Sequence, residues 1–132
     1  MSRSEPFVIH EDDCEFEGAD GGPFGSIRWR TLVSGDRTPS DSLTVGVAEL
    51  EPGESEPFMP HSHAQAEVYY ILSGEGTVTI SGAVHPVRPG SAVFIPGGAE
   101  HGARNTGVEL LRLFYVFPSN SFPDIEYAFP SS

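Results

Sequence analysis

The sequence predicts an all-β domain, either a sandwich or a closed barrel. Short segments rich in apolar and β-branched residues recur along most of the 132-residue chain. Fifteen glycines and twelve prolines punctuate these segments, as expected where short strands are joined by tight turns. No run of about 10–15 residues shows the spacing of an amphipathic helix. The length suits a single domain with one core.

The chain divides into a short lead and one domain. Residues 1–25 are acidic and contain four glycines and a proline between residues 18 and 25, which predicts a loosely structured N-terminal segment. Residues 26–132 carry the strand-like segments and end in a densely aromatic tail. A tail this apolar on an acidic chain is expected to fold back over the barrel mouth, which would bring Tyr127 toward the interior.

Seven segments have the composition or the two-residue period of strands. The first has Arg28 and Arg30 on one face, where we expect them to be exposed. Ser81-Gly82 predicts a two-residue hairpin turn. The last segment is nearly continuous apolar sequence, which predicts a strand covered on both faces. The segments are Ser26–Val33, Leu43–Leu50, Glu67–Leu72, Gly76–Ile80, Ala83–Val87, Ser91–Ile95 and Glu109–Phe117.

Charge excludes several classes of partner. The formal net charge of -12 repels nucleic acid phosphates and anionic lipid, so neither is expected to bind. The chain has no lysine, which excludes Schiff-base chemistry through that side chain. No apolar run is long enough to cross a bilayer, and the polar N-terminus lacks the apolar stretch of a signal peptide. We therefore expect a soluble, cytoplasmic protein.

Three of the five histidines lie in a pattern typical of metal ligands. His61, His63 and Glu67 occupy odd positions, so all three side chains share one face if an extended strand runs through them. His101 completes a set of three imidazoles and one carboxylate. This set suits one divalent transition metal ion, whether Fe, Zn, Mn, Ni or Co. One carboxylate against a divalent ion leaves a net positive site, which favours a small carboxylate substrate at an open position.

Two tyrosines follow the ligands. Tyr69 shares the parity of Glu67 and should point into the barrel, whereas Tyr70 should point outward. A phenol beside a divalent cation can lose its proton and act as a general base. A structural role in the core is an equally strong reading of Tyr69, because buried tyrosines usually find partners there.

The metal pattern resembles that of a known family. Gly53…His61-x-His63-x3-Glu67-x6-Gly74 is similar to the first cupin motif, and Gly90-x5-Pro96-x-Gly98-x2-His101-x3-Asn105 is similar to the second. The resemblance implies a double-stranded β-helix, the cupin jelly-roll barrel, which is often a homodimer.

A narrower resemblance, over most of residues 26–130, is to the small single-cupin dimethylsulfoniopropionate lyases. The similar segments are Ile27-Arg-Trp29-Arg, Glu67-Val-Tyr69, Gly98-Ala-Glu-His101, Phe114-Tyr-Val-Phe117-Pro and Ile125-Glu-Tyr127. The resemblance implies that Tyr69 is the catalytic base and that Tyr127 assists in binding or catalysis.

The function implied is β-elimination from a carboxylate substrate, releasing dimethyl sulfide and acrylate. The substrate's sulfonium cation could rest against Trp29 or Phe94, although core packing alone would also account for both rings. Three other functions use the same scaffold: an Fe(II) dioxygenase, an isomerase or epimerase, and a small-molecule-binding protein without catalysis.

Overall fold

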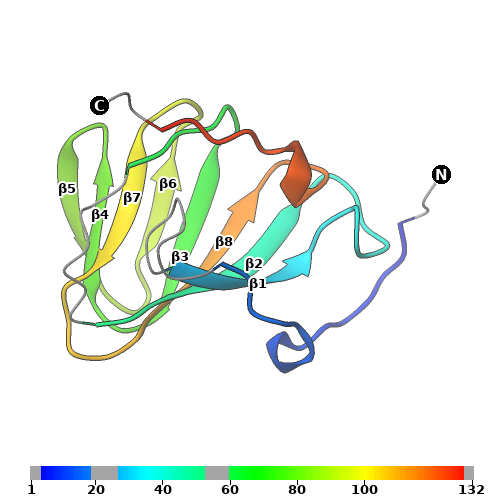
Figure 1. Cartoon of the computed structure of the whole chain (residues 1–132), viewed down its shortest axis with the longest axis horizontal. Helices are drawn as coiled ribbons and strands as arrows, with labels where there is room; N and C mark the ends of the chain where they lie inside the picture. The colour runs from blue at the N-terminus through cyan, green and yellow to red at the C-terminus, as the bar shows by residue number, and fades with distance from the viewer. Residues whose placement is uncertain (1–3, 19–26, 53–59, 130–132) are drawn as a thin grey trace.

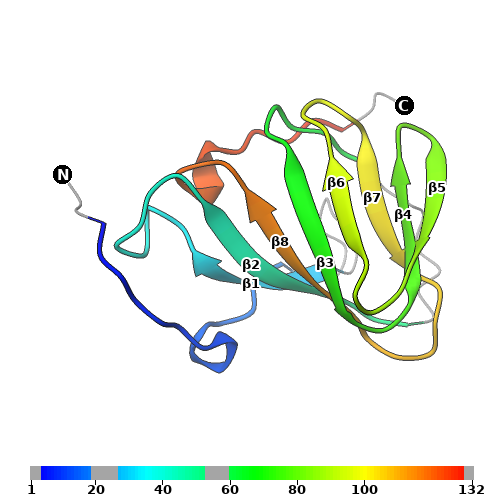
Figure 2. The same ribbon diagram turned by 180° about the vertical axis from the view of Figure 1, so that it is seen from behind.

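The computed structural model describes residues 4–18, 27–52 and 60–129 and consists of two antiparallel sheets (Figure 1). The five-stranded sheet has the order β1-β2-β8-β3-β6, and the three-stranded sheet has the order β5-β4-β7. Figure 2 shows the strands of the larger sheet side by side, with β8 near its middle. The strands are β1 Ile27–Val33, β2 Thr44–Leu50, β3 Glu67–Ser73, β4 Gly76–Ile80, β5 Ala83–Val87, β6 Ala92–Ile95, β7 His101–Asn105 and β8 Leu111–Phe117.

The all-β prediction is confirmed, and each of the seven expected segments contains a strand. Within the described residues the only helical elements are two single 3-10 turns, η1 Glu11–Asp13 and η2 Phe122–Asp124. Strand β7 was not expected, because Gly102, Arg104 and Asn105 interrupt any apolar alternation. It forms because β4 offers a free edge beside it, and the two strands pair from Gly76↔Asn105 to Ile80↔His101.

The core lies between the sheets and takes every second residue of the central strand. On β8 the odd-numbered residues, Leu111 to Phe117, are buried, and the even-numbered ones between them are half-buried. The strand is therefore covered on both faces, as predicted, although less completely on its outer face. Its outer apolar residues are partly open to solvent, so continuous apolar sequence overstated the burial.

Two turns behave as their residues require. Ser81 and Gly82 both have positive φ, at 49° and 84°, which is the backbone of a type I′ hairpin turn between β4 and β5. Gly90 also has a positive φ, 93°, and closes the turn in which the Ser91 amide donates to the Arg88 carbonyl at 2.9 Å. Gly53, the first position of the first motif, lies outside the described residues.

The described part of the N-terminal segment lies against β1. The backbone of Glu17 pairs with that of Trp29, through amide–carbonyl distances of 2.7 and 3.0 Å. The Glu17 carboxylate accepts a hydrogen bond from the Thr31 hydroxyl at 2.6 Å and two from Arg37 at 2.8 and 2.9 Å. Residues 4–18 therefore have little regular structure, yet they are attached to the barrel at a defined register.

The arginines of β1 are engaged rather than simply solvated. The guanidinium carbons of Arg28 and Arg30 lie 4.2 and 3.9 Å from the centre of the Phe16 ring, a cation–π arrangement. Arg28 also donates to Glu49 at 2.9 Å, and Arg30 lies 3.3 Å from Asp12. The expectation that both are exposed was wrong for Arg30, whose side chain is 19% exposed, because the N-terminal segment covers it.

No helix among the described residues is both long and apolar enough to span a bilayer.

Candidate functional site

Three imidazoles meet inside the barrel. The candidate ligand nitrogens of His61, His63 and His101 all lie within 4.8 Å of one another. His63 and His101 are buried, and His61 is half-buried. His61 and His101 are far apart in the sequence but lie side by side in the fold. Their backbones form an antiparallel bridge, with amide–carbonyl distances of 2.9 and 2.8 Å. The unexpected strand β7 thus begins at a histidine of the cluster and sets its position.

These side chains do not converge in the way predicted from the sequence, which was that His61, His63 and Glu67 share one face of a single strand. No single strand runs through residues 61–67: His61 and Ser62 form isolated bridges, the chain bends at Ala64 and Gln65, and β3 starts at Glu67. The bend packs against the turn before β7, where the Gly98 amide donates to the His63 carbonyl at 2.8 Å. A Cβ at Gly97 would lie 2.2 Å from the Ala64 carbonyl oxygen, so this approach requires glycine.

Glu67 joins the cluster through one carboxylate oxygen. Its Oε1 lies 3.1 Å from Nε2 of His63 and 3.1 Å from Nε2 of His101. The other ring nitrogens of these histidines face backbone carbonyls, with Nδ1 of His63 2.8 Å from Gln65 and Nδ1 of His101 2.9 Å from Ala99. A carbonyl oxygen only accepts, so each Nδ1 carries the hydrogen.

This arrangement fits a divalent cation. With Nδ1 protonated, a neutral imidazole presents a lone pair at Nε2, and both lone pairs face an anionic carboxylate oxygen. Such a meeting of acceptors is unfavourable unless protons or a metal ion supply positive charge. The 3.1 Å contacts bring Oε1 of Glu67 and the two Nε2 atoms close enough together for one ion to be held by all three. The backbone contacts at Nδ1 are the outer hydrogen bonds that commonly orient metal-binding histidines.

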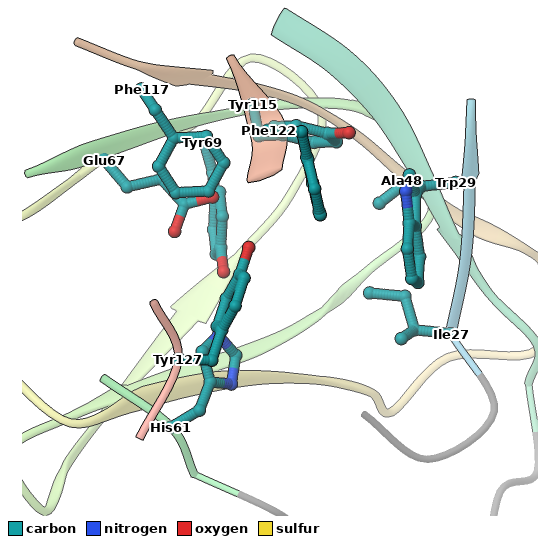
Figure 3. Close-up of a pocket in the computed structure, with 10 residues that line it drawn as sticks. All are labelled: Ile27, Trp29, Ala48, His61, Glu67, Tyr69, Tyr115, Phe117, Phe122 and Tyr127. Carbon is teal, nitrogen blue, oxygen red and sulfur yellow. The ribbon is translucent and has the colours of Figure 1, made fainter. Parts of the chain in front are cut away.

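A pocket adjoins the cluster (Figure 3). Its volume is about 60 Å³, room for about four to six waters. Aromatic rings form most of its wall, and Glu67 and His61 are the only acidic or basic side chains among the described lining residues. The lining consists of Ile27, Trp29, Ala48, His61, Glu67, Tyr69, Tyr115, Phe117, Phe122 and Tyr127.

Tyr69 and Tyr127 enter the pocket from different elements, as predicted from the sequence. Figure 3 shows both hydroxyl groups directed toward the centre of the pocket, Tyr69 from β3 and Tyr127 from the C-terminal tail. Burial raises the pKa of both phenols well above the ordinary value, and the nearby Glu67 carboxylate raises them further. Both therefore hold their protons at neutral pH unless a cation in the site offsets these effects.

The tail folds over the barrel as expected. The backbone of Ala128 pairs with that of Ser62, with amide–carbonyl distances of 2.8 and 2.9 Å. This bridge places the Tyr127 ring 5.4 Å from the His61 ring and 5.3 Å from the His63 ring, measured between centroids. In Figure 1 the tail runs across the ends of β3, β6 and β7.

The outward prediction for Tyr70 is confirmed, since it is 46% exposed, but one aromatic expectation was wrong. Phe94 is 65% exposed on the outer face of β6 and does not line the pocket, whereas Trp29 does. Tyr115 and Phe122 were missed as pocket residues. The odd parity that Tyr115 shares with the other inward residues of β8 could have indicated it. Phe122 depends on the path of the tail, which local sequence does not give.

The comparisons with known proteins agree with this geometry. Residues 46–117 match the cupin domain family. The chain is 41% identical over 127 residues to dimethylsulfoniopropionate lyase DddW of Ruegeria pomeroyi, covering 96% of this chain and 82% of that protein. It is 30% identical over 83 residues to an oxalate-binding protein of Thermotoga maritima, covering 63% of this chain and 68% of that one.

A solved structure extends the likeness to the fold. The polyketide cyclase RemF of Streptomyces resistomycificus superposes with a TM-score of 0.77 at 25% identity, covering 97% of this chain and 89% of that one. Together with the two antiparallel sheets, this confirms the predicted double-stranded β-helix. One relative that the chain matches over most of its length is a dimethylsulfoniopropionate lyase, and the chain itself belongs to the cupin family.

Proposed function

We propose that this cupin is a metal-dependent lyase that cleaves dimethylsulfoniopropionate, or a carboxylate of the same kind, by proton abstraction and β-elimination. The ligands of the metal are His61, His63, Glu67 and His101. The observation that carries the proposal is the convergence of these four side chains at one end of an aromatic pocket that also holds two tyrosine hydroxyls. The similarity to the lyase DddW supports it independently.

The charges around the pocket suit a zwitterionic substrate. No arginine lines the described part of the pocket, and the chain has no lysine, so a substrate carboxylate needs another positive group to bind it. A bound divalent metal supplies that charge and stabilises the negative charge that develops on the carboxylate as the α-proton leaves. The sulfonium group is attracted to aromatic faces, which Trp29, Phe122 and Tyr127 provide.

The residues of this chain then perform the elimination. The phenolate oxygen of Tyr69 takes the α-proton, and the electron pair of that C–H bond forms the double bond of acrylate. The β-carbon–sulfur bond breaks, and its electron pair leaves with dimethyl sulfide. A sulfonium is a good leaving group and needs no acid. Tyr127 orients the substrate from the tail, and the surrounding rings exclude water.

Product analysis tests the reaction. Protein loaded with a divalent metal should release dimethyl sulfide into the headspace and acrylate into solution in equal amounts, with or without oxygen. An Fe(II) dioxygenase would instead consume oxygen in step with substrate and would stop without air. Oxygen-dependent turnover without dimethyl sulfide would therefore replace the lyase proposal.

The role of Tyr69 is tested by removing one oxygen atom. Tyr69→Phe should lose elimination by a factor of about 10²–10⁴, the usual contribution of a positioned acid or base, while still binding metal. Tyr70→Phe is the matched control, because the ring of Tyr70 is 46% exposed and lies on the opposite face of β3 from Tyr69. A Tyr69→Phe protein with the turnover of the Tyr70→Phe protein would contradict the assignment.

A second candidate function is binding without catalysis, which the similarity to an oxalate-binding protein favours. A dicarboxylate could occupy the metal end of the same pocket, but it would leave the aromatic end unfilled. Calorimetric titration of metal-loaded protein with oxalate and with dimethylsulfoniopropionate separates the two. The cytoplasmic location and the homodimer expected from the sequence stay predictions.

A further inference from the structure

The open space of the pocket adjoins the middle of the inner face of β2, where the side chains are small. The even-numbered residues of β2 pair with the inward, odd-numbered residues of β8, and the middle two of them, Gly46 and Ala48, are the smallest residues available. Ala48 lies between Trp29 of β1 and Leu113 of β8 in the strand register. Figure 3 shows Ala48, Trp29 and Ile27 on one side of the pocket, across from Glu67.

Tyr115 of β8 occupies the space over Gly46 of β2, next to Ala48. It pairs with Gly46 in the register of β2 and β8, and with Tyr69 in the register of β3 and β8. A Cβ added to Gly46 would lie 2.2 Å from the Tyr115 hydroxyl oxygen and 2.4 Å from its ring carbon Cζ. The phenol therefore lies in the groove that glycine leaves, and the adjacent space over Ala48 stays open.

We propose that Ala48 and the Gly46–Tyr115 pair set the size of the cationic head group that the pocket accepts. The substrate carboxylate occupies the histidine end, and the dimethylsulfonium group occupies the space beside Ala48 and Trp29. This inference rests on the proposed function for its substrate, but the size limit belongs to the pocket itself. Bulk added at residue 48 should reject larger head groups, and bulk removed at residue 115 should admit them.

Turnover of two substrates tests the proposal. The ratio of kcat/KM for dimethylsulfoniopropionate to that for its diethyl analogue should rise about tenfold or more in Ala48→Val, since a pocket rejects extra methylene groups by about that factor. The same ratio should fall about tenfold in Tyr115→Leu. Gly46→Ala should also raise the ratio, because its methyl group displaces the Tyr115 ring, but the same methyl group would lie 2.6 Å from the Arg30 carbonyl oxygen, so this variant is used only where circular dichroism shows an unchanged fold. If Ala48→Val fails to fold, Tyr115→Leu carries the test.

Matched controls separate pocket size from general loss of packing. Ala103→Val makes the same change at a partly buried core residue that does not line the pocket. Gly107→Ala makes the same change where the nearest atom to the new Cβ is at an ordinary 3.4 Å. Both should leave the substrate ratio unchanged within about twofold.

Binding provides a readout that does not need catalysis. Trp29 is the only tryptophan and lines the pocket, so its fluorescence reports occupancy. Zinc-loaded protein is titrated with trimethylammoniopropionate and triethylammoniopropionate, whose amines are poorer leaving groups. The ratio of the dissociation constant for the triethyl compound to that for the trimethyl compound should rise in Ala48→Val and fall in Tyr115→Leu, as the turnover ratio does.

The outcomes distinguish the two proposals. In one outcome the ratio of dissociation constants shifts in the variants as expected, but no protein releases dimethyl sulfide. This result would support the size limit and refute the lyase function. The size limit alone would be refuted by a different result. In that case the protein releases dimethyl sulfide, but the turnover ratio and the binding ratio both stay within about twofold in Ala48→Val and Tyr115→Leu.

Discussion

At the scale of residues, the site depends on a single carboxylate oxygen held between two imidazoles. Oε1 of Glu67 contacts Nε2 of both His63 and His101, while backbone carbonyls fix the hydrogen on each Nδ1. The spacing of the histidines and the glutamate in the sequence was enough to predict that these side chains come together. The parity argument for their convergence was incomplete, because the chain bends at Ala64 and Gln65 and β7 supplies the remaining histidine.

Replacing that carboxylate tests its place in the set. Glu67→Gln keeps the shape but removes the negative charge, so zinc affinity should fall at least about tenfold in a calorimetric titration. Glu75→Gln, at an exposed position just beyond β3, is the matched control and should bind zinc as the unchanged protein does. Equal affinity in both variants would remove Glu67 from the ligand set.

At the scale of elements, a strand could be predicted where its own residue pattern determines its structure. A strand that forms only because a neighbouring strand pairs with it could not be predicted. The hairpin of β4 and β5 was predicted with its bounds, because Ser81-Gly82 specifies the turn. Strand β7 was missed, because only its partner β4 makes it a strand. The lead segment illustrates the same limit: its composition indicates loose structure, whereas Glu17 ties it to Trp29, Thr31 and Arg37.

The Glu17 attachment should appear in the pH dependence of stability. Burial alone would raise the pKa of Glu17, but hydrogen bonds from Arg37 and Thr31 outweigh it and lower the pKa below the ordinary 4.5. A group whose pKa is lower in the folded state stabilises the protein at pH values above its pKa in the unfolded chain. This contribution to the free energy of unfolding is lost as the pH falls through the pKa of the folded state. The pH window for the loss is therefore below about 4.5.

Urea unfolding at several pH values measures this contribution. At pH 7, Glu17→Gln should lower the free energy of unfolding by about 0.5–1 kcal/mol, a modest value because solvent screens the pair. The difference from the unchanged protein should shrink as pH falls from 4.5 toward pH 3, because the glutamic acid takes up its proton as pH falls through the lowered folded pKa. Glu15→Gln, at an exposed neighbouring position, should show no difference at either pH. A deficit in Glu17→Gln that does not shrink between pH 7 and pH 3 would contradict the ion-pair explanation.

At the scale of the whole molecule, the barrel places side chains from distant parts of the sequence around one pocket. β1 provides Trp29, β2 Ala48, β3 Glu67 and Tyr69, and the tail Tyr127. The fold class and the four side chains that converge could be predicted, because alternation and spacing are local signals. The pocket wall could not be predicted in full, because it depends on strand register and on the bridge that holds the tail to Ser62.

The dependence of turnover on bound metal is the most direct test of the central claim. Protein stripped with a chelator and returned to buffer should release no dimethyl sulfide from dimethylsulfoniopropionate. Adding a divalent metal in small steps should restore release in proportion, with a plateau at one ion per chain. Turnover by the stripped protein, or no dimethyl sulfide from protein carrying one ion per chain, would contradict the account.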